Sequence, residues 1–102
     1  MNKAPKTIEE AYAELDKIFE REPRAKAEFA AVAKKEDMVQ FHHTLGQWMR
    51  NNWGLWRNSK LAQLLETKKI MHPDNMSGAL LEGYWCYRHN VSYEYKGSGC
   101  PI

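Results

Sequence analysis

The stretch TIEEAYAELDKIF, residues 7–19, has the pattern of the start and body of an amphipathic α-helix. Thr7 and Glu10 have the spacing of a capping box, in which each side chain accepts a hydrogen bond from a free backbone N–H of the first turn. Pro23 lacks a backbone N–H, so we expect this helix to end before it. The apolar side chains recur every three or four residues, which places them on one face. They are Ile8, Tyr12, Leu15, Ile18 and Phe19.

Helical periodicity continues beyond this stretch. Residues 24–35 keep a weaker helical period and predict a second helix. Asp37, with Gln40 three residues later, is a candidate N-cap for a third helix. That helix should end near Asn52, because Gly54 suits the left-handed backbone that commonly follows a helix.

The second half of the chain predicts two more helices. Ser59 is a candidate N-cap for a short helix that carries Leu61, Leu64 and Leu65. In the tripeptide His72-Pro73-Asp74, Pro73 restricts the backbone and Asp74 can cap a last helix that runs to about residue 89.

The last helix is apolar on two sides. Such a helix is either sandwiched in the core or presents an apolar face to a partner. Trp85 lies opposite the side expected to be core, which holds Met76, Leu80, Tyr84 and Tyr87. We expect Trp85 to be covered by residues 91–96, through Tyr93 or Tyr95; the alternative is an exposed Trp85 in a homodimer interface.

Length and composition bound the class of protein. A chain of 102 residues with 43% apolar residues suits one globular domain. The sequence therefore predicts an all-α, single-domain bundle of four to five helices over residues 1–102. We expect residues 1–6 and 96–102 to be flexible tails, with a short C-terminal segment that could be extended.

The same numbers predict a compartment. No apolar run approaches the roughly 20 residues that span a bilayer. The first residues are polar and lead into a charged helix, so we expect no signal peptide, no membrane contact and a cytoplasmic protein. Cys86 and Cys100 are then expected to be free thiols.

Four segments together resemble a known family. They are TIEEAYAELDKI at 7–18, HHTLGQWMRNNWGLW at 42–56, SKLAQLL at 59–65 and HPDNMSGALLEGYW at 72–85. In these segments the chain resembles the DUF6794 domain family, small and mostly bacterial proteins of unknown function. The resemblance covers nearly the whole chain apart from its two tails. It implies a single domain, and it implies no activity, cofactor or partner.

Candidate binding residues lie on the third predicted helix. The apolar spacing predicts one face that holds Met38, Phe41, Leu45, Trp48, Met49 and Asn52. At 100° per residue, His43, Gly46, Arg50 and Trp53 share another side, displaced from this predicted buried face. On an exposed stripe, Gly46 would open a gap for a partner, Arg50 would offer a planar fork of donors and Trp53 a stacking face. The alternative is that Arg50 pairs with Asp74 or a glutamate and that Trp53 closes the core.

The favoured function is a binding module that docks on a protein, as an inhibitor, adaptor or regulatory subunit, rather than an enzyme. Protein interfaces concentrate their binding energy in Trp, Tyr and Arg, and the second half of this chain is rich in them. The predicted partner-binding residues are His43, Arg50, Asn51, Trp53, Trp56, Arg57 and Trp85. The residues expected to be structural are Gly46, Gly54, His72, Pro73 and Asp74.

Two other functions stay open. One is nucleic-acid binding by the basic side chains Arg50, Arg57, Lys60, Lys68 and Lys69, although the net charge of +2 is low for that class. The other is a small-ligand or catalytic site formed by His43, Arg50, His72 and Asp74.

We expect no metal and no cofactor. Cys86 and His89 lie one helical turn apart, and Cys100, His72 or His43 could complete a zinc site. The chain has no Cys-x-x-Cys pair, however, and structural thiols are the simpler interpretation.

Overall fold

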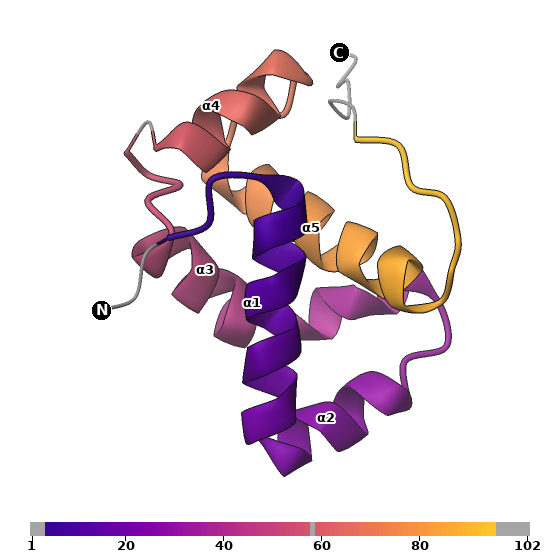
Figure 1. Ribbon diagram of the computed structural model, residues 1–102. Coiled ribbons are helices and arrows are strands. Elements are labelled where there is room, and N and C mark those ends of the chain that lie inside the picture. Colours follow the sequence, from indigo (N-terminus) through magenta and orange to yellow (C-terminus); the bar gives the residue numbers. More distant parts are fainter. Residues whose placement is uncertain (1–3, 58, 96–102) are drawn as a thin grey trace.

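The computed structural model of the protein describes residues 4–57 and 59–95. The all-α class is confirmed: within these residues the chain forms five α-helices, a 3-10 segment (η1) and a π-helical segment (η2), with no strand (Figure 1). The elements are α1 (Ile8–Arg21), α2 (Pro23–Ala30), η1 (Lys35–Phe41), η2 (His42–Gly46), α3 (Gln47–Asn52), α4 (Lys60–Thr67) and α5 (Pro73–Arg88). None of the helices in this described part of the chain has the length and apolar character to cross a bilayer.

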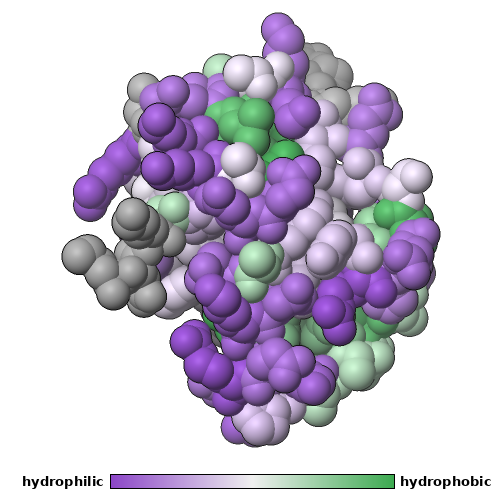
Figure 2. Space-filling view, in the orientation of Figure 1, coloured by the Kyte–Doolittle hydropathy of each residue, from purple (hydrophilic) through white to green (hydrophobic). Residues whose placement is uncertain are grey.

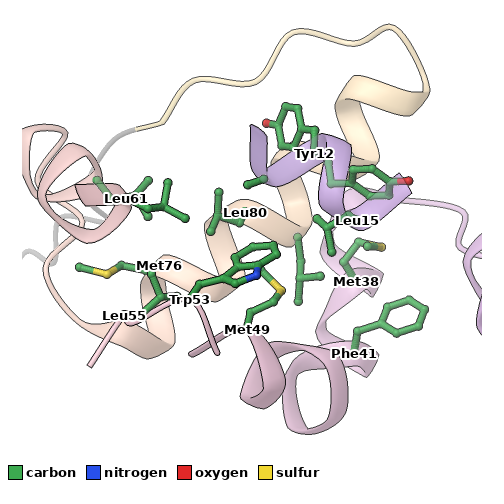
Figure 3. Close-up of a cluster of buried hydrophobic side chains, with 14 of the residues drawn as sticks. Tyr12, Leu15, Met38, Phe41, Met49, Trp53, Leu55, Leu61, Met76 and Leu80 are labelled. Atoms are coloured by element: carbon green, nitrogen blue, oxygen red, sulfur yellow. The ribbon is translucent and has the colours of Figure 1, made fainter. Parts of the chain in front are cut away.

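Helix α5 is the centre of the bundle. It contacts η1, η2, α1, α3 and α4, and α1 crosses in front of it (Figure 1). Leu80 of α5 is fully buried and points toward Met49 and Trp53 of the α3 region (Figure 3). The core is therefore built mainly between α5, α1 and the η1–α3 stretch.

The N-terminus of α1 follows the predicted capping box in part. The Thr7 hydroxyl accepts the Glu10 N–H at 3.1 Å, which confirms Thr7 as the N-cap. The Glu10 carboxylate instead accepts the N–H of Lys6, at 2.8 Å. Ala4 also packs against the core, and Pro5 is buried.

The third helix differs from the prediction. Asp37 does not cap it: the segment begins after Lys34 as a 3-10 turn, and Asp37 lies inside it. Gln40 donates from its side-chain amide to the carbonyl of Asp37 at 3.1 Å. The π turn of η2 then inserts about one extra residue before α3, as such turns do. Beyond this point the buried face consists of Gly46, Met49, Arg50 and Trp53.

The two helix boundaries around the α3–α4 loop are confirmed. Gly54 has a left-handed φ of 69°, and the N–H of Leu55 donates to the carbonyl of Arg50 at 3.2 Å, the long bond of a Schellman motif. The Ser59 hydroxyl accepts the N–H of Ala62 at 3.2 Å and caps α4.

Helix α5 begins two residues earlier than an Asp74 cap requires. His72 occupies the N-cap position without a side-chain bond, and Pro73 is already helical. Asp74 therefore lies in the first turn, and the prediction that it caps the helix is wrong. Proline suits this position because its fixed φ matches the helix and it has no N–H to satisfy.

The cover over Trp85 also differs from the prediction. Its indole N–H donates to the carbonyl of Val32 at 3.2 Å, and its ring stacks on His89 at 3.9 Å. Residues 91–95 instead reach Tyr12 and Glu82, so the expectation that Tyr93 or Tyr95 covers Trp85 is wrong.

Two further expectations concern the second apolar side and the chain end. Tyr87, expected in the core, is 52% exposed, whereas Leu81 on the second apolar side is buried. The predicted tail 96–102, with Cys100, lies outside the described residues.

Candidate functional site

Arg50 joins α3 to α5. Its side chain is buried, with 7% of the residue exposed, and its Nη1 donates to the Ser77 hydroxyl at 2.9 Å. Its Nε lies 3.3 Å from Oδ1 of Asp74, at ion-pair distance but without the alignment of a hydrogen bond. Arg50 and Asp74 are thus brought together as the structural alternative anticipated, and Arg50 does not lie on an exposed stripe.

Gly46 and Trp53 belong to the same buried face. A Cβ at Gly46 would lie 3.4 Å from Nη1 of Arg50, so the glycine packs against the guanidinium and does not open a gap for a partner. Trp53 is only 3% exposed and closes the core (Figure 3). The prediction that Gly46, Arg50 and Trp53 are exposed is wrong. The π turn adds about one residue before α3, and this rotates their side of the helix toward the core.

The exposed residues of this region form what we call the tryptophan surface: Trp48, Asn51, Asn52, Trp56 and Arg57. Trp56 is 61% exposed and Trp48 is 40% exposed. The apolar spacing predicts that Trp48 is buried, so its exposure was not predicted. The reason is that no local pattern in the sequence indicates the π turn. Asn51, Asn52, Trp56 and Arg57 are all exposed on α3 and the loop that follows it.

A hydrogen bond restrains the Trp56 indole, and a ring contact restrains the Trp48 indole. The Trp56 indole N–H donates to Oδ1 of Asn51 at 3.2 Å. The Asn52 amide donates to the carbonyl of Trp48 at 2.9 Å, and the Trp48 ring meets Trp53 edge-on at 5.8 Å. The two asparagines therefore fix the local shape of the surface instead of only ending the helix.

Two depressions flank this surface. The first is lined by Trp48 and Asn52 together with Lys17 and Arg21 of α1. The second is lined by Asn51, Asn52, Arg57 and Ser59, among others. Trp53 and Ala4 border both, so the depressions adjoin each other. Among the described residues, neither Arg21 nor Arg57 has an ion-pair partner, which leaves both guanidinium groups available to an incoming acceptor.

The remaining predicted binding residues lie apart from the tryptophan surface. His43 is exposed on η2, with its ring edge-on to His42. Trp85 is held on α5 by Val32 and His89. In the described part of the chain, no hydrogen bond or ring contact joins either side chain to Trp56.

One whole face of the molecule is largely polar, with separate apolar areas rather than one continuous patch (Figure 2).

The proposed small-ligand cluster is not assembled. A depression of about 300 Å³ is lined by Asp74 with His42, Glu82 and Tyr93, among others, but His43, Arg50 and His72 do not line it. His72 is exposed at the start of α5, and Asp74 is engaged with Arg50.

Cys86 is a buried free thiol, and burial raises the pKa of its thiol, which lowers its reactivity as a nucleophile or ligand. Over residues 4–57 and 59–95, no three His, Cys, Asp or Glu side chains are close enough together to hold a metal ion.

Comparison with known proteins identifies the family. No curated protein and no solved structure matches the chain. A family model described as a domain of unknown function, DUF6794, matches residues 4–88, which run from Ala4 to the end of α5. The chain therefore belongs to the DUF6794 family.

Proposed function

We propose that this protein is a binding module that docks on a protein partner through the tryptophan surface, as an inhibitor, adaptor or regulatory subunit. The observation that carries the proposal is Trp56, which is 61% exposed yet hydrogen-bonded to Asn51. An indole exposed to this degree leaves a large apolar area in water, and its burial by a partner would be favourable.

The neighbours of Trp56 support the same function. Arg57 follows it, Trp48 is the second exposed indole, and two asparagine amides lie between them. Trp and Arg are the residue types that most often dominate protein interfaces, with polar groups around them. Since Asn51 already restrains Trp56, less conformational entropy is lost when a partner binds.

The charge distribution favours a protein over a nucleic acid. Arg50, one of the five basic residues considered for phosphate contacts, is buried and faces Asp74. The others are Arg57, Lys60, Lys68 and Lys69, in a chain whose net charge is only +2. A phosphate-binding surface usually needs a denser array of exposed cations.

The proposal places the protein in the cytoplasm. There, a buried thiol such as that of Cys86 stays reduced. No cofactor is part of the proposed docking.

The test is affinity capture from extracts of the native host with three full-length proteins: wild type, Trp56→Ala/Arg57→Ala and Met71→Ala. Met71 is a matched control because it is 58% exposed but lies outside the tryptophan surface. We expect one protein to be captured by wild type and by Met71→Ala and to be lost with the double variant. Recovery of the same protein with all three would contradict the proposal.

Salt and nuclease treatment separate the competing outcomes. A protein partner should remain after nuclease treatment, and its binding should weaken moderately with salt. A nucleic acid would be removed by nuclease and would lose affinity steeply as salt rises. Light scattering at several protein concentrations shows whether the partner is a second copy of the chain, in which case Trp56→Ala/Arg57→Ala should be monomeric.

A further inference from the structure

The segment of residues 91–95 folds back over α5. Asn90 has a left-handed φ of 59°, and the N–H of Val91 donates to the carbonyl of Cys86 at 2.8 Å, which reverses the chain direction. The segment then runs alongside α5 toward α1 (Figure 1). The Tyr93 hydroxyl donates to Glu82 at 3.0 Å, and the Tyr95 hydroxyl is hydrogen-bonded to that of Tyr12.

Gly83 shapes the place where this segment lies. The glycine is buried in the middle of α5, and a Cβ there would collide with the hydroxyls of both Tyr95 and Tyr12. A glycine inside a helix costs roughly 1 kcal/mol relative to alanine. The residue is therefore explained by the close approach of the two tyrosines and not by the helix itself.

The segment is an irregular stretch that contacts the helices mainly through two side chains. Residues 91–95 belong to no helix or strand, and Val91, Ser92 and Glu94 are exposed. Tyr93 and Tyr95 supply its partly buried side chains. The family match ends at residue 88, so residues 91–95 lie outside the matched domain. The residues of α1 and α5 that they contact lie inside that domain.

The surface of α5 that residues 91–95 contact continues beyond them as an open trough. From Tyr93 and Glu82, a depression of about 300 Å³ follows α5 past Gly78 toward Asp74. A Cβ at Gly78 would meet no atom within 4 Å, so space remains above this glycine. The open end borders Asp74, whose carboxylate faces Arg50.

We propose that Tyr12, Glu82 and Gly83, with the open trough at Gly78, form a docking groove for an extended protein segment that presents two tyrosines two residues apart. Residues 91–95 are its displaceable occupant within the same chain. A partner segment with this chemistry can make the same two hydroxyl contacts. A partner segment that continues along the trough would also contact α5 at Gly78, which residues 91–95 leave uncovered.

Residues 91–95 already occupy the groove, so a partner segment must bind strongly enough to displace them. A short linker gives a tethered segment an effective concentration on the order of millimolar, so a segment with equal contacts competes poorly. A partner that also fills the trough at Gly78 makes more contacts and can displace the tether. The groove is separate from the tryptophan surface, so the two proposals stand or fall independently.

The test uses a fluorescent peptide with the sequence of residues 90–96 and a control peptide in which both tyrosines are alanine. Anisotropy titrations compare wild type with full-length Tyr93→Ala/Tyr95→Ala, whose groove should be vacated. We expect the tyrosine peptide to bind this variant at least tenfold more tightly than it binds wild type, and the control peptide to bind neither. Adding Gly83→Ala to the variant should abolish binding, because the new Cβ occupies the place of the tyrosine hydroxyl.

Three outcomes would overturn the proposal. Equal binding of the tyrosine peptide to wild type and to the variant would place its site elsewhere. Absence of binding to a variant with native circular dichroism would show that the groove has no affinity of its own. A variant that does not fold would show that residues 91–95 are an integral part of the core and not a displaceable segment.

Discussion

Nε of Arg50 and Oδ1 of Asp74 lie 3.3 Å apart across the contact between α3 and α5. The first residue comes from the segment RNNWGLW and the second from HPDN, so two of the segments that carry the family resemblance meet at this pair. The Arg50 side chain is 8% exposed and that of Asp74 is 62% exposed, so water screens one partner only. The pair therefore has the role of neutralising a guanidinium that the core has largely desolvated.

Removal of the carboxylate should destabilise the fold. Because Asp74 is mostly solvated, we expect Asp74→Asn to cost about 1–2 kcal/mol, less than a fully buried pair would. Arg50→Ala should cost more, about 2–4 kcal/mol, since it also leaves a cavity and removes the hydrogen bond that the Ser77 hydroxyl accepts. Urea denaturation measures both, with Asp37→Asn as an exposed control. If Asp74→Asn is as mild as the control, the pair does not stabilise the α3–α5 contact.

The two glycines of α5 should respond in opposite directions to alanine. Gly78 has open space, so Gly78→Ala should raise stability by about 0.5–1 kcal/mol through helix propensity. Gly83→Ala should lower it by about 1–3 kcal/mol, as overpacking does, and should release residues 91–95. Denaturation midpoints and limited proteolysis after α5 measure these effects. Equal stabilisation by both substitutions would show that the tyrosines do not depend on Gly83.

The neighbouring tryptophans Trp53 and Trp56 should separate stability from binding. Trp53→Ala removes a buried indole and should cost about 3–5 kcal/mol. Trp56→Ala should change the free energy of unfolding by no more than about 0.5 kcal/mol, because its side chain is mostly exposed. Thermal denaturation checks both values. A large loss of stability in Trp56→Ala would mean that this indole serves the fold and would weaken the proposed docking function.

Alkaline pH should destabilise the protein. Burial is the main cause that raises the pKa of Tyr12, Tyr84, Tyr93 and Tyr95 above the ordinary tyrosine value. Above about pH 10 the unfolded chain loses these protons while the folded chain keeps them, so the unfolded state is favoured as pH rises. The stability from these groups is fully present below about pH 10 and is lost toward their folded-state pKa values.

Denaturation midpoints at increasing pH, with tyrosinate absorbance followed in parallel, measure this loss. Tyr84→Phe is a useful comparison, because Tyr84 donates to Asp16 at 2.7 Å and the carboxylate adds to the effect of burial. The variant should be less stable at neutral pH and should lose less stability per pH unit above about pH 10. Unchanged midpoints across this range in the wild type would contradict the burial of the tyrosine hydroxyls.

Local signals in the sequence determined the helical class and several helix ends. Thr7 and Ser59 cap their helices, and Gly54 takes the left-handed position after α3. Each of these depends on atoms within a few residues along the chain: a hydroxyl near a free N–H, or a glycine where a Cβ is unfavourable. Such preferences act wherever the segment folds, so they can be read without knowledge of its neighbours.

Only the tertiary structure decided which helix faces are buried and what covers them. The π turn before α3 shifted Arg50 and Trp53 inward and left Trp48 at the surface, although the apolar spacing indicated otherwise. Trp85 is covered by Val32, and the tyrosines of residues 91–95 lie on Tyr12 and Glu82 instead. These outcomes depend on contacts between residues far apart in the chain, whose packing and polar pairing outweigh the small energetic preferences of a local helical pattern.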